Sequence, residues 1–271
     1  MKALNFIYDV LNTSMEVPKS YGAYHIASVV ITLILAVLMV AFLKNTKDKT
    51  VRAITAVIWI VVVFFEITKQ LLYGIHMNES GAFYWDYNWY FFPFQFCSSP
   101  LYILPIVAFA RNGKLRDAAI AFLATFSVFA GICVYVFPND VFTNFTFINI
   151  QTMIHHGVQI FFGAYLAFRY RDKLNLRGLV GATGIFTALA AIALILNIGT
   201  HHIFPLVGIN ESINMFFISP YHSCSLPVLS MVDEALPYIP FLCVYIFGFM
   251  LFAGLIMLIM KGLIKITRYS K

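Results

Sequence analysis

Apolar residues gather into seven stretches of about 20 residues, separated by shorter polar connections. A membrane-spanning helix needs about 20 apolar residues, so each stretch is long enough to cross a bilayer. The stretches are Gly22–Leu43, Val51–Ile75, Phe91–Ala110, Ala118–Phe137, Phe145–Phe168, Leu179–Ile198 and Tyr238–Met260. The pattern therefore predicts an all-α polytopic membrane protein with about seven transmembrane helices.

The segments on either side of this region differ from it in character. Residues 1–21 carry Phe6, Ile7, Val10 and Leu11 at helical spacing, which predicts a segment lying along the outer membrane interface. A mobile tail is the alternative. Residues 22–260 form the predicted seven-helix transmembrane domain, and residues 261–271 form a basic cytoplasmic tail.

Composition supports the same class of protein. Of the 271 residues, 61% are hydrophobic and only 11% are charged. A soluble domain carries about 25% charged residues, so this chain cannot cover itself for water. We expect a multi-pass protein of the cell membrane.

The net charge of +6 is distributed over alternate connections. Basic residues surround the first, third and fifth connections and the C-terminus, whereas the second, fourth and sixth contain no Lys or Arg. They are Lys44, Lys47, Lys49, Arg52, Arg111, Lys114, Arg116, Arg169, Arg171, Lys173, Arg177, Lys261, Lys265, Arg268 and Lys271. The positive-inside rule predicts a cytoplasmic C-terminus and an N-terminus outside. Because orientation accounts for the charge, we expect the bilayer as partner and no nucleic acid; the oligomeric state is left open.

Polar side chains in the second predicted helix share one face. Glu66, Lys69, Gln70 and Tyr73 are spaced at i, i+3, i+4 and i+7, which places them together in the outer half of the helix. Glu66 and Lys69 can pair, and pairing lowers the cost of a charge in hydrocarbon. Two interpretations stay open: a structural ion pair, or one wall of a polar cavity.

The third predicted helix contains a thiol between two prolines. Cys97 lies between Pro93 and Pro100, and Pro100 cannot donate to the helical hydrogen-bond ladder. The resulting kink would open space around the thiol, about 8 Å below the helix start. A lone helical cysteine is more often a small buried hydrophobic residue than a reactive one.

The fifth predicted helix strengthens the candidacy of Cys97. It presents Thr152, His155, His156 and Gln159 at i, i+3, i+4 and i+7. Imidazole is a suitable base for a thiol, since the thiolate is the nucleophile. Adjacent histidines point about 100° apart, so one of the two is central to a site. A Cys–His pair in the outer half of the membrane is permitted by the predicted depths.

Other polar residues add candidates and leave questions open. Adjacent histidine pairs lack the i, i+4 spacing of helical zinc sites, so we expect no metal. Four cysteines allow three full disulfide pairings, and a disulfide through Cys97 would exclude it as nucleophile. The sixth connection, about residues 199–237, is long and apolar, and either caps a cavity or packs along the interface. The full set of candidate cavity residues is Glu66, Lys69, Gln70, Gln95, Ser98, Gln151, Gln159, His202 and Asn214.

Several of these residues carry a resemblance to known membrane proteins. Residues 93–97 with Leu101 and Leu104, and His156 with residues 165–166, resemble two helices of the YwaF-type bacterial integral membrane proteins. Residues 214–220 and 236–238 resemble that family's last outer loop and final helix. The family is similar to a human transmembrane acyltransferase family acting on ether phospholipids, and more distantly to androgen-regulated hydrolases of fatty-acid esters.

The resemblance implies that a cysteine and a histidine on separate helices are catalytic. The matching positions are Cys97 and His156, although the His155–His156 doublet leaves the choice of histidine open. His201 and His202 align loosely with a further histidine-bearing stretch of that family.

These observations favour a lipid acyltransferase or lipid hydrolase that uses Cys97 as nucleophile and His156 or His155 as base. Membrane lipids would be the substrate, Gln95, Ser98 or Gln151 would stabilise the oxyanion, and no cofactor is needed. One alternative is a transporter or solute-binding protein in which Glu66, Lys69 and the histidines line a polar pathway. Another is a structural partner with an ion-paired core.

Overall fold

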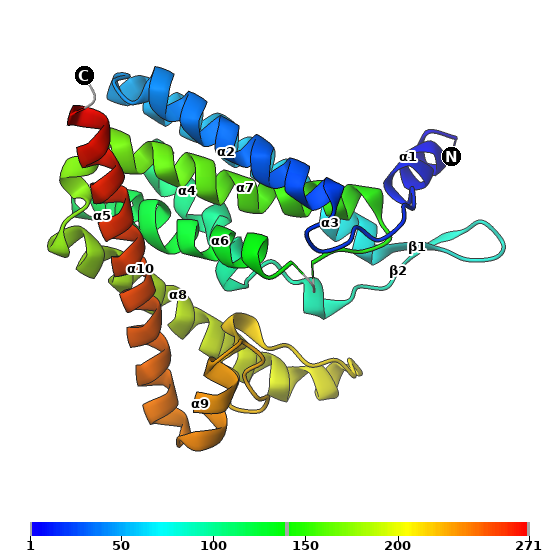
Figure 1. Ribbon diagram of the computed structural model, residues 1–271. Helices are drawn as coiled ribbons and strands as arrows, with labels where there is room; N and C mark the ends of the chain where they lie inside the picture. Colours follow the sequence, from blue (N-terminus) through cyan, green and yellow to red (C-terminus); the bar gives the residue numbers. More distant parts are fainter. Residues whose placement is uncertain (1, 139–140, 270–271) are drawn as a thin grey trace.

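The protein is a predominantly helical membrane protein with very little strand. A computed structural model, shown in Figure 1, describes residues 2–138 and 141–269. Met1 of the predicted N-terminal segment and Lys271 of the predicted basic tail therefore lie outside the described residues. The helices are α1 (Lys2–Leu11), α2 (Ala23–Leu43), α3 (Asp48–Gly74), α4 (Pro100–Phe109), α5 (Lys114–Phe122), α6 (Val128–Val136), α7 (Thr146–Arg169), α8 (Leu176–Ile203), α9 (Leu229–Ala235) and α10 (Tyr238–Tyr269). A short antiparallel hairpin joins β1 (Ile75–Met77) to β2 (Phe83–Trp85).

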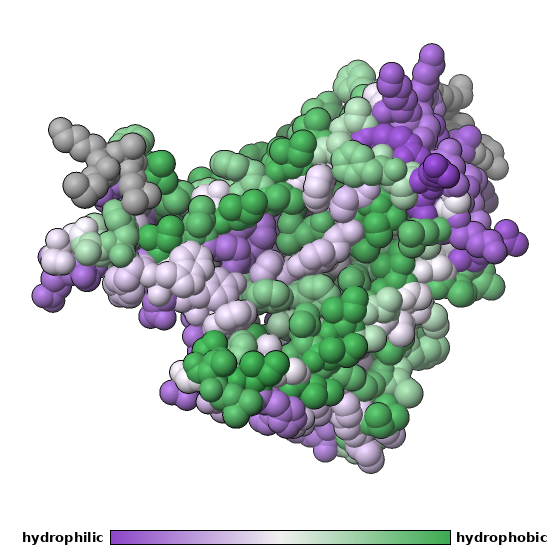
Figure 2. Space-filling model, turned by 180° about the vertical axis from the view of Figure 1, so that it is seen from behind, coloured by the Kyte–Doolittle hydropathy of each residue, from purple (hydrophilic) through white to green (hydrophobic). Residues whose placement is uncertain are grey.

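Within residues 2–138 and 141–269, five helical segments are long and apolar enough to cross a membrane: α2, α3, Lys114–Val136, Leu176–Val207 and Tyr238–Thr267. Their outward-facing side chains are apolar, as at Phe42 and Ile195, which are 76% and 69% exposed. Figure 2 shows apolar residues covering much of one face, with strongly hydrophilic residues gathered towards one end. The polytopic all-α class is confirmed, whereas the count of seven spans stays a prediction.

The third predicted helix differs from its expected extent. The stretch expected as one helix over 91–110 forms two 3₁₀ turns, Trp89–Phe91 and Phe96–Ser98, and becomes α-helical only at Pro100. Proline is favoured in the first turn of a helix because its missing N–H would have no intrahelical partner there. Cys97 therefore lies in a 3₁₀ turn before α4, and its expected place inside a kinked helix was wrong.

Helix α7 packs closely against the segment formed by α5, a π-helical turn at Leu123–Ser127, and α6. Two glycines permit this approach. A Cβ atom at Gly131 would lie 2.7 Å from the carbonyl oxygen of His156, and one at Gly163 would lie 2.5 Å from that of Leu123. Larger side chains would push α7 away, so glycine positions the helix that carries more buried polar side chains than any other helix in the described residues.

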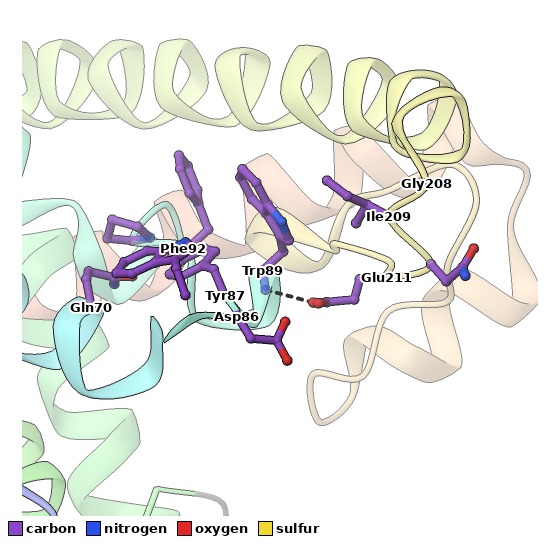
Figure 3. A pocket seen from close by; sticks show the side chains of 11 residues that line it. Gln70, Asp86, Tyr87, Trp89, Phe92, Gly208, Ile209 and Glu211 are labelled. Carbon is purple, nitrogen blue, oxygen red and sulfur yellow. Dashed lines mark hydrogen bonds between the residues drawn. The ribbon is translucent and has the colours of Figure 1, made fainter. Parts of the chain in front are cut away.

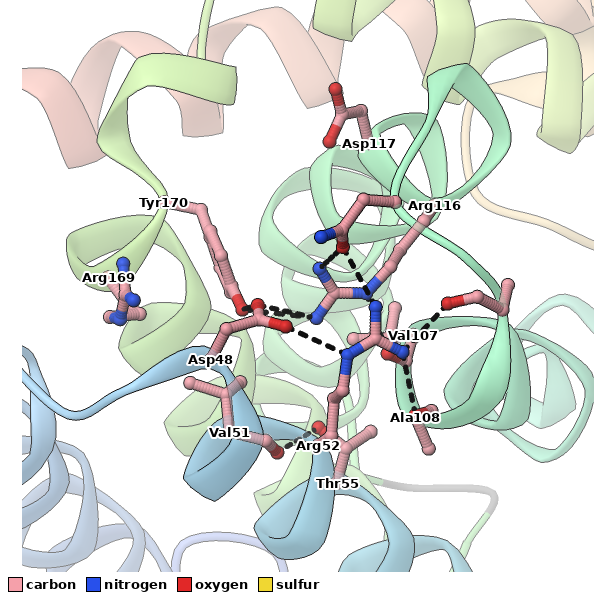
Figure 4. Close-up of polar contacts among 12 residues, drawn as sticks. Asp48, Val51, Arg52, Thr55, Val107, Ala108, Arg116, Asp117, Arg169 and Tyr170 are labelled. Carbon is pink, nitrogen blue, oxygen red and sulfur yellow. Dashed lines mark hydrogen bonds and ion pairs between the residues drawn. The ribbon is translucent and has the colours of Figure 1, made fainter.

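Three basic connections meet at one end of the molecule, which we call the basic end (residues 44–52, 110–117 and 169–177). Asp48 accepts hydrogen bonds from Arg52 Nε at 2.8 Å, Arg116 Nη2 at 2.9 Å and the Tyr170 hydroxyl at 2.5 Å (Figure 4). Arg116 is only 3% exposed. The β-hairpin and the apolar connection before α9 lie towards the opposite end, the hairpin end. Which end faces the cytoplasm stays a prediction.

Candidate functional site

The candidate site begins with a row of polar side chains buried on α7. Gln151, Thr152, His155, His156 and Gln159 are each less than 9% exposed. Polar groups in a membrane protein face the protein interior and need partners there. The neighbours of this row therefore decide what the site can do.

The α7 row holds the backbone of Cys97. The carbonyl oxygen of Cys97 accepts two hydrogen bonds, from His155 Nε2 at 2.8 Å and from Gln159 Nε2 at 2.7 Å. The predicted pairing of Cys97 with a histidine thus takes a different form, because His155 binds the main chain of Cys97. The two contacts nevertheless hold the turn that carries the thiol against His155 and Gln159 of α7.

His155 and His156 each keep one ring nitrogen without a hydrogen-bond partner among the described residues. His156 Nδ1 donates to the carbonyl oxygen of Thr152 at 2.8 Å, while its Nε2 is buried without a hydrogen bond among the described residues. His155 Nδ1 and Gln159 Oε1 are likewise buried without a hydrogen bond among the described residues. A neutral imidazole that donates from one nitrogen presents a lone pair at the other. The α7 row therefore offers two imidazole nitrogens that can accept a proton, one of them on the histidine that contacts the Cys97 turn.

A charged pair from α3 lies beside this group. Lys69 Nζ and Glu66 Oε1 are 2.8 Å apart, and Glu66 is 5% exposed. Both charges act electrostatically on Cys97 and His155. The α3 face thus faces the Cys97 turn, and Tyr73 from the same face stacks on Phe91 at 3.6 Å between ring centroids.

Gln95 and Asn214 join the Cys97 turn to the connection before α9. Gln95 donates from Nε2 to the carbonyl oxygen of Asn214 at 3.0 Å, and its Oε1 accepts from the amide of Phe216 at 2.8 Å. Asn214 in turn accepts from the amide of Ser219 at 2.9 Å. The long connection therefore packs onto the site, and the side chains of Gln95 and Asn214 use their hydrogen bonds to hold that connection in place.

The remaining candidates divide between the site and the surface. Ser98 is buried and its side chain lies beside the Cys97 thiol. His202 is exposed and bonds the Tyr221 hydroxyl at 3.1 Å, so no described contact brings it to Cys97. All four cysteines lie within the described residues and are free thiols, which answers the disulfide question. No group of three or more His, Cys, Asp or Glu side chains in the described part of the chain is arranged so that it could hold a metal ion.

A pocket opens at the hairpin end, next to this site. It has a volume of about 830 Å³ and is shown in Figure 3. Its lining residues are Gln70, Trp85, Asp86, Tyr87, Trp89, Phe92, Pro93, Gly208, Ile209, Asn210 and Glu211. Gln70 connects the pocket to the charged pair, because it accepts a hydrogen bond from the Tyr87 hydroxyl and donates to Glu66 Oε1 at 2.5 Å.

Comparison with known protein families matches residues 20–261 to the TMEM164 family. The chain belongs to the TMEM164 family. The match spans every candidate residue described above, from Glu66 to Asn214. No curated protein and no solved structure matches the chain.

Membership of the TMEM164 family supports a membrane protein and leaves the finer resemblance to YwaF-type proteins an expectation. The family match does not assign roles to residues, so the chemistry must be argued from the site. The pocket could not be predicted from the sequence because its residues come from three separate segments: Gln70 of α3, residues 85–93 and residues 208–211. The cluster of Trp85, Tyr87 and Trp89 was a signal, but it reads equally well as an aromatic belt at a membrane interface.

Proposed function

We propose that this TMEM164-family protein is a lipid acyltransferase or lipid hydrolase of the cell membrane, with Cys97 as nucleophile. The observation that carries the proposal is the attachment of the Cys97 turn to α7 through His155 and Gln159, on a helix whose His155 and His156 each keep a buried ring nitrogen without a partner. Thiol, base and apolar helices together suit transfer of an acyl chain out of the bilayer. The resemblance noted in the sequence supports the same chemistry.

We assign His156 as the base and His155 as a positioning residue. The Nδ1–H of His156 is held by the Thr152 carbonyl, which leaves Nε2 to accept the thiol proton. The thiolate would attack the acyl carbonyl, and the imidazolium would return the proton to the leaving alkoxide, giving a thioester on Cys97. A second hydroxyl, from an acceptor lipid or water, would then attack the thioester and restore the thiol.

Stabilisation of the tetrahedral oxyanion falls to Ser98 or Gln151 among the predicted donors. Gln95 is less suitable, because its amide already donates to the Asn214 carbonyl and its oxygen accepts from Phe216. A positioned donor of this kind is worth about 10²–10³ in rate. Removing Ser98 should therefore slow the acylation step without preventing folding.

The experiment is to trap the acyl-enzyme. Purified protein is incubated with a phospholipid bearing a fluorescent acyl chain, quenched in acid, and analysed by peptide mass spectrometry. We expect a thioester on Cys97 in the natural protein and in the matched control Cys133→Ala, a free thiol in α6. Cys97→Ala should carry none, and His156→Ala should form it about 100-fold more slowly. Thioester labelling that persists in Cys97→Ala contradicts the proposal.

One observation favours transport as a second candidate. The contacts from Tyr87 through Gln70 to Glu66 and Lys69 form a polar line from the pocket towards the membrane interior. In a transporter, solute flux into proteoliposomes would survive Cys97→Ser and be lost in Glu66→Gln. Loss of flux in Cys97→Ser would argue against this role.

A further inference from the structure

The pocket at the hairpin end has a negative, aromatic lining without a basic side chain. Asp86 and Glu211, from distant segments of the chain, both belong to its lining, and Figure 3 shows their carboxylates below the rings of Tyr87 and Trp89. Trp85, Tyr87 and Trp89 supply aromatic rings. Carboxylates and aromatic faces both attract cations, so the two features agree in the ligand they favour.

The chain cannot neutralise these carboxylates with its own Lys or Arg nearby in sequence. Neither residue type occurs between Lys69 and Arg111, or between Arg177 and Lys261. Lys69 itself is paired with Glu66. Within the described residues, neither Asp86 nor Glu211 takes part in an ion pair, and Glu211 Oε2 accepts only from the amide of Trp89, at 2.7 Å.

The aromatic rings pack against one another to form one wall of the pocket. Trp85 and Tyr87 lie nearly parallel, with ring centroids 5.8 Å apart and planes 6° from each other. Tyr87 and Trp89 are perpendicular, with centroids 5.2 Å apart and an angle of 87°. Gly74 fixes this arrangement, because a Cβ atom there would lie 2.5 Å from the Trp85 ring. Walls at right angles present aromatic faces in more than one direction.

We propose that this pocket binds an organic ammonium group, with the rings contacting its apolar substituents and Asp86 and Glu211 balancing its charge. A bare metal ion is a poorer fit, since Ca²⁺ takes six to eight oxygen ligands and the pocket has two carboxylates. The ammonium is either a free small cation or the headgroup of a lipid. This proposal does not depend on a catalytic role of Cys97. The two sites are neighbours, because Gln70 hydrogen-bonds both Tyr87 of the pocket and Glu66 beside the Cys97 turn.

The experiment measures binding of radiolabelled choline to the purified protein by equilibrium dialysis. We expect saturable binding that falls about fivefold or more in Glu211→Gln, Asp86→Asn and Trp85→Leu. Glu211→Gln is the sharpest of these, because an amide oxygen can still accept from the Trp89 amide. Glu79→Gln is the matched control, since Glu79 is exposed on the hairpin turn outside the pocket lining.

Competing ligands show whether the pocket recognises the charge or the shape of choline. They also show whether the natural ligand is a free cation or a lipid headgroup. 3,3-Dimethyl-1-butanol replaces the choline nitrogen by carbon and should not displace choline. If dihexanoylphosphatidylcholine competes better than choline, the natural ligand is a lipid headgroup. If choline competes better, the natural ligand is a free cation. Dihexanoylphosphatidylglycerol, which has no ammonium group, should not compete in either case. The proposal is overturned by equal competition from the neutral analogue, by unchanged binding in both charge variants, or by displacement with Ca²⁺ alone. Cys97→Ala should bind choline normally even if the acyl-transfer proposal fails.

Discussion

Single hydrogen bonds divide the histidine doublet into two roles. His155 uses its Nε2–H to bind the Cys97 carbonyl, whereas His156 uses its Nδ1–H on its own helix and leaves Nε2 available. The i, i+3, i+4, i+7 spacing predicted that these side chains would share a face with Gln159. Spacing could not predict which ring nitrogen is bound, because the partner carbonyl of Cys97 lies 58 positions away in the chain.

At the basic end, a single hydroxyl is expected to make stability depend on pH. Burial and the hydrogen bond to Asp48 raise the pKa of Tyr170 from 10.0 to about 12. The neutral phenol therefore stabilises the fold fully below pH 10, and that contribution is lost as the pH rises through 12. Tyr170→Phe should lower the free energy of unfolding by about 1–2 kcal/mol at pH 8, with a difference that narrows above pH 10.

The measurement is denaturant unfolding in detergent at pH 8 and pH 11.5. Tyr84→Phe serves as the control, because Tyr84 is half exposed on β2 and should show the same small effect at both values. A Tyr170→Phe difference that is constant across the range would show that the Asp48 contact does not control this titration.

Among the elements, the third apolar stretch shows the limit of hydropathy. Residues 91–99 are apolar enough for a membrane-spanning helix, so their hydropathy predicts that the helix includes them. Pro93 and Pro100 instead break the backbone ladder, and Gln95 and Cys97 find their hydrogen bonds in distant segments. The other six stretches contain no proline in their interiors apart from Pro240 near the start of α10, and all six form helices, although α10 continues to Tyr269, nine residues beyond its predicted end at Met260.

The packing of α7 leads to a prediction about glycine. Gly163→Ala should destabilise the protein by about 1–3 kcal/mol, because its Cβ would overlap the Leu123 carbonyl in the π-helical turn. Gly184→Ala in α8 is the matched control, since a Cβ there meets nothing within 4 Å and alanine favours a helix. Thermal unfolding of both variants in detergent tests this. Equal melting temperatures would mean that α7 can shift without cost.

For the whole molecule, assembly of the site depends on contacts that no single segment encodes. The pocket joins residues 85–93 to 208–211, and the Cys97 turn joins α3, α7 and the connection before α9. Alternating charge, in contrast, is visible in the sequence, and the three basic connections do meet at one end. Figure 1 places the hairpin at the other end.

Orientation is the prediction that belongs to this scale. The positive-inside rule assigns the basic end to the cytoplasm, so the pocket would open outside and take its ligand from the outer leaflet or the external medium. Asn210→Cys, at the pocket, should react with a membrane-impermeant maleimide in intact cells. Arg171→Cys, at the basic end, should react only after permeabilisation, and the natural protein, whose own thiols include Cys97, sets the baseline. The reverse pattern would place both the pocket and the Cys97 site on the cytoplasmic side, where a cytosolic acyl donor or cation would reach them.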